Sequence, residues 1–370
     1  MKNTQKYAFK IESATHPGIT GKQNEDRYGS TMFLAGEKRI PCLLSVLCDG
    51  IGGHHAGEKA AEMGVSIITE VITGSDPTDP LAAIQAAVTT ASEAIFRTSL
   101  TDAKFSGMGS TCAVAWLIGD QLYTANLGDS RIYILRRGQI IQLTTDHTWV
   151  QEALDAGVIN GDDYEGHPNA HVIRRYLGSK SPPEPDFRLW YFAGEQDSDA
   201  FQNQGMKIKP GDTLLLCSDG LTDLVADHEI FEAVQSNPLT QVPDMLIELA
   251  NQRGGYDNTT VVLIQSQPKN ELIKNSKKRQ VAAGCFGGLI LLITVIAAVV
   301  LVVCFLNGRL QQDSYPTPTP TMAIDPGLLE PSGDISPTLS PTTTSSSSNS
   351  TEFMPPQYTI TPWPTHTPAP

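Results

Sequence analysis

The chain has 370 residues and a formal net charge of -14, from 40 acidic and 26 basic side chains. This excess of acid argues against a nucleic-acid partner, because nucleic-acid-binding proteins carry a basic surface that neutralises phosphates. The six cysteines form no C-x-x-C pair and lie mostly in apolar runs, which favours small buried thiols over a zinc site or a disulfide framework.

The first half of the chain predicts one buried strand followed by two helices. The apolar run at residues 43–48 is expected to be a strand whose side chains are buried. Apolar residues then recur at helical spacing over 57–72, which predicts an amphipathic helix. Asp79 and Pro80 are typical of an N-cap and a first helical turn, so a second helix is expected over 81–98.

A series of strands is predicted after these helices. Gly119-Asp120 and Arg137-Gly138 indicate tight connections between neighbouring strands, as hairpins require. A last helix is expected over 242–253. The strand-like segments, rich in β-branched and apolar residues, are 111–118, 121–127, 130–143, 212–219 and 258–265. We therefore expect an α+β fold in which helices cover the outer faces of two stacked antiparallel sheets.

The C-terminal hundred or so residues have a different character. Residues 281–306 form an apolar run without a charged side chain, and roughly 20 such residues span a bilayer, so we expect a transmembrane helix. Residues 269–280 form a basic linker, which by the positive-inside rule places the N-terminal domain in the cytoplasm. Residues 307–370 are rich in Pro, Thr and Ser and are expected to be a disordered tail outside the cell membrane.

Acidic residues recur where the expected strands begin or end. A single Asp-Gly after a strand indicates only a turn, but several carboxylates brought together would raise one another's pKa unless a cation neutralised them. Mg²⁺ and Mn²⁺ favour such oxygen ligands, and two ions about 3.5–4 Å apart can clamp a phosphoryl group. The acids are Glu25, Asp26, Asp49, Asp129, Asp219 and Asp257.

The glycine after Asp49 has a use in such a site. Because Gly50 has no Cβ, its carbonyl group can approach an ion and the chain can turn sharply beneath it. Asp49 would then be the carboxylate that bridges both ions.

Eight short motifs, in this order, resemble the metal-dependent Ser/Thr protein phosphatases of the protein phosphatase 2C family, bacterial branch. The motifs are "NEDR" at 24, "DGIGGHHAGE" at 49, "GSTCAVA" at 109, "NLGDSRIY" at 126, "TTDHTWVQEALDAG" at 144, "HPNAHVIRRYLG" at 167, "CSDGLTD" at 217 and "DNTTVVL" at 257. The resemblance covers nearly all of residues 10–266 and implies that 1–268 form the catalytic domain.

The resemblance implies a four-layer αββα sandwich with a dinuclear Mg²⁺ or Mn²⁺ site that activates water to hydrolyse phosphoserine and phosphothreonine on proteins, in opposition to a Ser/Thr kinase. Asp49 matches the bridging ligand, and the carbonyl of Gly50 a ligand of the first ion. Asp219 and Asp257 match the ligands of the second ion, and together with Asp49 they form the implied catalytic set.

Further positions match supporting roles in the family. Asp129, with Asp219, matches the ligands of a weaker third ion in bacterial members. Glu25 and Asp26 match acids that orient metal-bound waters. The stretch 148–175 matches a mobile flap beside the site.

One position departs from the pattern. Bacterial members usually carry an arginine four residues before the glutamate of the "NED" motif, and here that position is Gly21. Lys22 is the candidate for binding the substrate phosphate, although a lysine cannot make the bidentate contact of an arginine. The alternative function is a catalytically weak phosphatase fold that acts as a binding or sensor module coupled to the outer tail.

Overall fold

The computed structural model describes residues 7–52, 55–161, 166–268 and 299. The expected linker, membrane span and tail after residue 268 lie outside the described residues, apart from Val299. Within the described part of the chain, no helix is both long and apolar enough to cross a membrane.

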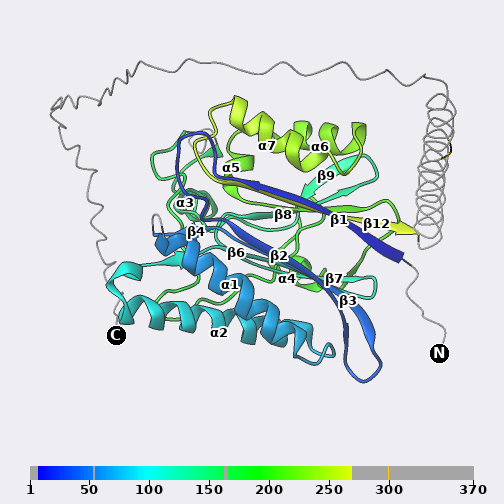
Figure 1. Cartoon of the computed structure of the whole chain (residues 1–370), viewed down its shortest axis with the longest axis horizontal. Helices are drawn as coiled ribbons and strands as arrows, with labels where there is room; N and C mark the ends of the chain where they lie inside the picture. Colours follow the sequence, from blue (N-terminus) through cyan, green and yellow to red (C-terminus); the bar gives the residue numbers. More distant parts are fainter. Residues whose placement is uncertain (1–6, 53–54, 162–165, 269–298, 300–370) are drawn as a thin grey trace, which may run out of the picture. The chain divides into compact units, whose positions relative to one another are not determined.

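Two five-stranded antiparallel sheets form the centre of the domain (Figure 1). The first has the order β1 (Tyr7–His16), β12 (Thr259–Pro268), β11 (Thr213–Cys217), β8 (Arg131–Arg136), β9 (Gln139–Gln142). The second has the order β10 (Met206–Lys207), β7 (Gln121–Leu127), β6 (Cys112–Ile118), β3 (Ile40–Cys48), β2 (Arg27–Ala35). A small third sheet pairs β4 (Gly50–Ile51) with β5 (Gly109–Ser110).

Helices cover both outer faces of the sheet pair. The helices are α1 (His55–Thr73), α2 (Pro80–Thr101), α3 (Trp149–Asp155), α4 (Asp197–Gln202), α5 (Asp219–Thr222), α6 (Asp227–Ser236) and α7 (Val242–Gln252), with a 3₁₀ turn at Ala103–Phe105. In Figure 1, α1 and α2 lie on the side of β2 and β3, whereas α6 and α7 lie on the side of β1 and β12. The expected layering of helices outside two antiparallel sheets is confirmed.

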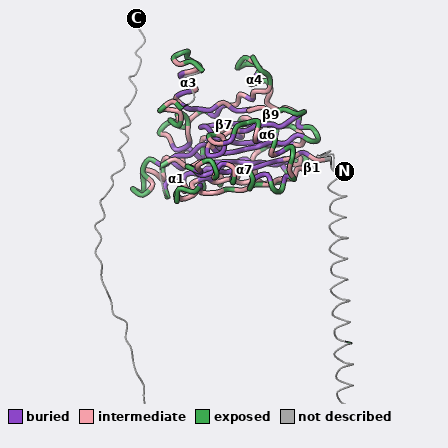
Figure 2. Tube along the Cα trace, turned by 90° about the horizontal axis from the view of Figure 1, so that it is seen from above, coloured by how far each residue is buried: buried purple, intermediate pink, exposed green. Residues whose placement is uncertain are grey.

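Three separate apolar cores hold these layers together. Successive residues of a strand face opposite sides of a sheet, so Leu43 and Leu47 of β3 enter the core between the sheets while Leu44 and Val46 enter the core beneath α1 and α2. A third core joins the outer face of β8, β11 and β12 to α6 and α7. Because both faces are covered, these strands read as continuous apolar runs, and Figure 2 shows the buried residues concentrated in them.

The predicted strands and helices correspond closely to observed ones, but several strands and short helices were not predicted. Asp79 caps α2 as expected, and its Oδ1 accepts a hydrogen bond from the Ala82 amide at 3.2 Å. The segment 130–143 divides at Arg137-Gly138 into β8 and β9, as its turn signal indicated. The sequence patterns did not predict β1, β2, β4, β5, β10, α3, α4, α5 or α6. The four cysteines in the described residues are buried and free.

The register of the sheets brings the predicted acids to one end of the domain. In the first sheet, Cys217 at the end of β11 lies opposite Val261 near the start of β12 and Arg131 at the start of β8. In the second sheet, Cys48 at the end of β3 lies opposite Arg27 at the start of β2. The acids flank these strand ends, so chain segments far apart in sequence meet at a single edge of the sandwich (Figure 1).

A buried ion pair lies at the end of the sandwich opposite the acids. The guanidinium of Arg136, at the end of β8, donates from Nε to Asp212 Oδ1 at 2.9 Å and from Nη2 to Asp212 Oδ2 at 2.6 Å. A further bond from Nη2 reaches the Lys207 carbonyl at 2.8 Å. Arg136 is 6% exposed and Asp212 4% exposed, so neither charge is solvated by water.

We expect Asp212→Ala to lower the free energy of unfolding by about 3–5 kcal/mol, because it leaves the Arg136 charge buried without a negatively charged partner. Chemical denaturation of the purified protein measures this change. Glu93→Ala is the matched control, since it removes an exposed ion pair with Arg97 on α2 that contributes about 0.5 kcal/mol or less. Equal losses in the two variants would contradict the stabilising role of the buried pair.

Candidate metal centre

The backbone around Asp49 is held by the neighbouring strand. The Asp49 amide donates to Thr111 Oγ1 at 2.8 Å, and the Asp49 carbonyl accepts from the Thr111 amide and the Ser110 hydroxyl, each at 2.8 Å. Both hydroxyl residues are fully buried. They therefore fix the direction in which the Asp49 side chain leaves β3, which agrees with the structural role that their position at a strand edge indicates.

Close backbone packing explains the glycine that follows each of two acids. A Cβ on Gly50 would overlap the backbone of Gly57 in the first turns of α1, and a Cβ on Gly220 would overlap the carbonyl of Asn258. The chain can thus bring α1 beneath Asp49 and α5 against the start of β12. Glycine at position 50 thus has a steric reason in addition to the expected approach of its carbonyl to an ion.

Two hydroxyl groups hold Asp26 at the junction of the two sheets. Asp26 Oδ2 accepts from Ser218 Oγ at 2.7 Å and from Thr260 Oγ1 at 2.6 Å, and the residue is 1% exposed. Burial raises the pKa of Asp26 to about 6. Burial and the charge of Asp257 raise the pKa of Glu25 to about 7, and the Glu25 amide donates to Asn258 Oδ1 at 2.6 Å.

The remaining acids repel one another strongly. Burial, followed by the charges of Asp26 and Asp219, raises the pKa of Asp49 well above its ordinary value. Burial, followed by the charge of Asp129, does the same to the pKa of Asp219. Asp129 is 5% exposed, and burial with the charge of Asp146 raises its pKa to about 7. The structure thus brings the predicted acids into one electrostatic cluster.

Lys22 lies at the exposed rim of this cluster. Its Nζ lies 3.1 Å from Asp257 Oδ2, and both side chains are about half exposed. The backbone of Gly21 has a φ of +79°, and a Cβ built there would meet no atom within 4 Å. A larger side chain at position 21 therefore has room but requires a left-handed backbone, which favours glycine.

The donor set fits divalent cations. Four buried carboxylate oxygens have no hydrogen-bond partner among the described residues: Glu25 Oε1, Asp26 Oδ1, Asp129 Oδ1 and Asp219 Oδ1. Such oxygens are costly when unpaired, and a hard cation is the ligand that satisfies several at once.

One group of possible metal ligands in the described residues was not predicted from the sequence. The ligand atoms of His171, Asp219 and Asp223 all lie within 4.8 Å of one another. A signal for Asp223 was available, because residues four apart on a helical turn face the same side and "DGLTD" places two aspartates at that spacing. No comparable pattern in the sequence pointed to His171.

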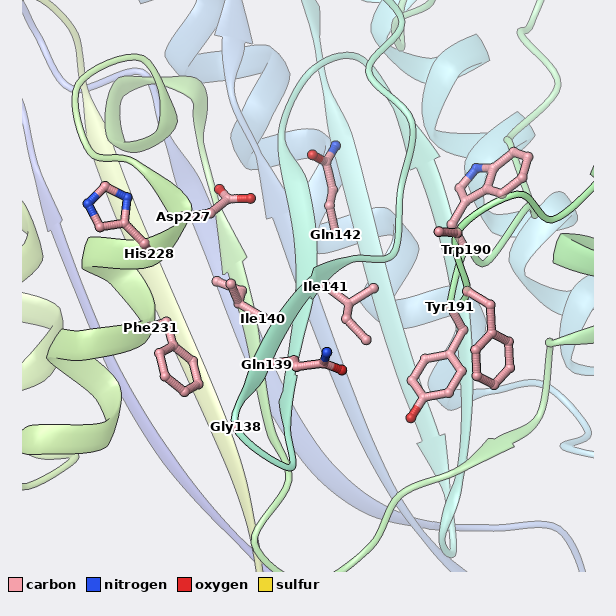
Figure 3. Close-up of a pocket in the computed structure, with 12 residues that line it drawn as sticks. Gly138, Gln139, Ile140, Ile141, Gln142, Trp190, Tyr191, Asp227, His228 and Phe231 are labelled. Carbon is pink, nitrogen blue, oxygen red and sulfur yellow. The ribbon is translucent and has the colours of Figure 1, made fainter.

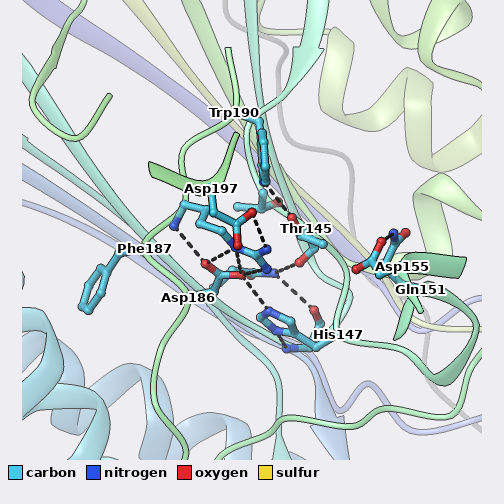
Figure 4. Close-up of polar contacts among 12 residues, drawn as sticks. Thr145, His147, Gln151, Asp155, Asp186, Phe187, Trp190 and Asp197 are labelled. Carbon is cyan, nitrogen blue, oxygen red and sulfur yellow. Dashed lines mark hydrogen bonds and ion pairs between the residues drawn. The ribbon is translucent and has the colours of Figure 1, made fainter. Parts of the chain in front are cut away.

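His147 supports the turn that carries Asp129. Its Nδ1 accepts from the Gly128 amide at 3.2 Å, and its Nε2 lies 3.2 Å from Asp186 Oδ2, a contact drawn in Figure 4. Hydrogen bonds from His147 and Arg188 hold the pKa of Asp186 well below its usual range. His147 is 3% exposed, so it is a satisfied buried histidine with a positioning contact one residue from Asp129.

The hollow shown in Figure 3 lies apart from the acids. It has a volume of about 850 Å³ and is formed by β9, the start of α6 and the aromatic residues Trp190, Tyr191 and Phe192. None of the predicted site residues lines it. The candidate metal centre therefore lies outside this hollow.

Comparison with known proteins agrees with this geometry. Residues 22–153 match the family described as Protein phosphatase 2C. The serine/threonine phosphatase stp of Listeria monocytogenes is 34% identical over 261 residues, which span 69% of this chain and 94% of that protein. The serine/threonine protein phosphatase PstP of Mycobacterium tuberculosis is 35% identical over 248 residues, which span 66% of this chain but only 43% of that protein.

A solved structure shares the fold. The catalytic domain of the serine/threonine protein phosphatase PstP in complex with two manganese ions superposes with a TM-score of 0.58 at 31% identity, covering 70% of this chain and 99% of that one. The similarity thus covers most of this chain and nearly all of that catalytic domain. The chain belongs to the protein phosphatase 2C family.

Proposed function

We propose that the protein removes phosphate from phosphoserine and phosphothreonine side chains of cytoplasmic proteins and so opposes a Ser/Thr kinase. The observation that carries this proposal is the convergence of six acids at one edge of the sandwich, four of which present a buried oxygen without a partner. The relatives are named as serine/threonine phosphatases, and one of them holds two manganese ions.

We assign the metal ligands as follows. Asp49 would bridge two Mg²⁺ or Mn²⁺ ions, and the Gly50 carbonyl would bind the first. Asp219 and Asp257 would bind the second, and Asp129 with Asp219 would hold a weaker third. When bound, the ions supply Lewis acidity and lower the pKa of water, so that hydroxide is available near neutral pH.

The protein groups around this centre provide positioning. Ser218 and Thr260 orient Asp26, and Asn258 holds the backbone of Glu25, so both acids face the centre from fixed positions and can accept protons from water. Lys22 would direct its positive charge at the substrate phosphate, and its contact with Asp257 places that charge at the rim of the acid cluster.

We further propose that the chain is anchored in the cell membrane by residues 281–306. The charge-free apolar run is long enough to cross a bilayer, and Lys274, Lys277, Lys278 and Arg279 precede it. The catalytic domain would then face the cytoplasm, and the Pro/Thr/Ser-rich residues 307–370 would lie outside.

We expect Asp219→Asn to reduce kcat/KM for a phosphothreonine peptide about 100-fold or more, because it removes a charge that binds the catalytic ions. EDTA should abolish wild-type turnover, and Mn²⁺ should restore it. In EDTA the variant should melt no lower than the wild type, since its removal of charge relieves repulsion. Glu232→Gln, an exposed change on α6, is the control, and wild-type turnover by Asp219→Asn would overturn the ligand assignment.

Gly21→Arg tests the departure from the family pattern. A guanidinium at this position should lower KM for phosphopeptides about ten-fold through a charge-assisted contact with phosphate, at a cost of about 1–2 kcal/mol in stability for the left-handed backbone. Gly21→Ala carries the same backbone cost without the charge and is the matched control. Identical KM values for the two variants would show that position 21 does not reach the substrate.

Cell fractionation tests the anchor. The full-length chain should sediment with membranes, deletion of 281–306 should release it, and deletion of 307–370 should leave it in the membrane fraction. Protease added to intact cells should remove only the tail. Recovery of the full-length chain in the soluble fraction would contradict the proposed span.

A further inference from the structure

The first turn of α1 carries a carboxylate that binds two residues of the segment 22–27. Glu58 Oε1 accepts a hydrogen bond from Arg27 Nη2, and Glu58 Oε2 accepts one from Gln23 Nε2. The side chains of Glu58 and Arg27 are each 31% exposed, so this contact is partly shielded from water. One side chain of α1 therefore holds two points on the segment that supplies three of the predicted site residues.

Gln23 is held from two directions. Its side chain binds Glu58 on α1, and its carbonyl accepts a hydrogen bond from Asn258 Nδ2, just before β12, at 3.1 Å. On the other side of Lys22 stands Gly21, which is exposed and has open space around its Cα. Gln23 is therefore the fixed neighbour of Lys22, and the direction of the lysine side chain depends on it.

Glu25 and Asp26 have supports of their own. The Glu25 amide donates to Asn258 Oδ1, and two hydroxyl groups donate to Asp26 Oδ2. None of these bonds involves Glu58. Removing its carboxylate should therefore release the Lys22 end of the segment and leave the two acids in place.

Arg27 keeps local partners when Glu58 is lost. Its Nη1 donates to the Asn24 carbonyl at 3.0 Å and to the Asp26 carbonyl at 2.7 Å. Because nearly a third of its side chain is exposed, the guanidinium would also be hydrated. An alanine at position 58 thus leaves no buried unpaired charge, and we expect that variant to fold.

We propose that Glu58 is a positioning residue for the substrate phosphate, and that it acts through Gln23 to direct Lys22. This inference rests on the proposed function, since it requires Lys22 to bind phosphate, and it adds a residue that contacts the neighbour of Lys22. A lysine that binds the phosphate equally in the ground state and the transition state affects KM and leaves kcat unchanged. Glu58 should therefore determine KM.

Steady-state hydrolysis of a phosphothreonine peptide by the full-length protein in detergent, with Mn²⁺, tests this role. Glu58→Ala should raise KM about ten-fold, the scale of one charge-assisted hydrogen bond, and should change kcat by less than about two-fold. Glu58→Gln retains an acceptor for Arg27 and an amide that can pair with a turned Gln23 amide, so it should recover most of the wild-type KM. Glu62→Ala removes an exposed ion pair with Lys59 one turn further along α1 and is the matched control.

A double-mutant cycle tests whether Glu58 acts through Gln23. Gln23→Ala alone should also raise KM about ten-fold, and adding Glu58→Ala to it should raise KM by less than about two-fold more, because residues that share one interaction are not additive. A general structural role would instead give multiplied effects. Multiplied effects, or a fall in kcat at unchanged KM in Glu58→Ala, would overturn the proposal.

The affinity for inorganic phosphate, measured by calorimetry in Mg²⁺, separates this inference from the proposed function. Glu58→Ala and Lys22→Ala should each weaken phosphate binding about ten-fold, whereas Glu62→Ala should not. Wild-type peptide turnover with the same phosphate affinity in wild type and Glu58→Ala removes only the role of Glu58. Weakened phosphate binding in Glu58→Ala without peptide turnover by the wild type removes only the proposed function. Absence of phosphate binding by the wild type also removes the role of Glu58.

Discussion

Mutual repulsion among buried carboxylates is the constraint on which the rest of this domain depends. Like charges at a few ångströms in a poorly solvated setting oppose folding, and the pKa values of Asp49 and Asp219 are raised accordingly. The surrounding structure must therefore hold the acids in place without neutralising them. It does so through backbone bonds to Asp49, hydroxyl donors to Asp26 and an asparagine beneath Glu25.

The hydrogen-bond partners that hold Asp49, Asp26 and Glu25 are neutral groups, and there is a chemical reason for this. Arg131 and Arg136, the strongly basic groups of the first sheet, are instead engaged by Asp146 and Asp212. A guanidinium inside the cluster would satisfy the carboxylates permanently and leave no charge to bind an ion. Hydroxyl and amide donors orient the same oxygens while keeping their negative charge available.

Much of this arrangement was predictable because its signals are local. Strands covered on both faces read as apolar runs, the cap at Asp79 is a short-range pattern, and the acids stand beside the strands that position them. The less predictable parts depend on contacts distant in sequence. β1 and β2 lack a continuous apolar run, since many of their side chains are only partly buried. His171 lies near Asp223 although it precedes the start of α5 by 48 residues, and its segment is held by the bond from the Arg174 amide to the His147 carbonyl.

Gly50 meets two separate steric requirements. The sequence suggested that Gly50 leaves space for an ion, whereas the structure shows that it also leaves space for α1. Both requirements exclude a Cβ at position 50, so the presence of glycine there does not show by itself which requirement selects it.

The direction of β12 determines where the described domain ends relative to the acids. β12 begins beside Asp257 and runs antiparallel to β1 until Pro268, which lies opposite Tyr7. At about 3.3 Å per residue this strand carries the chain roughly 30 Å from the acids before the domain ends. The described domain therefore ends far from the acids, at the end of the sandwich that carries the buried pair of Arg136 and Asp212.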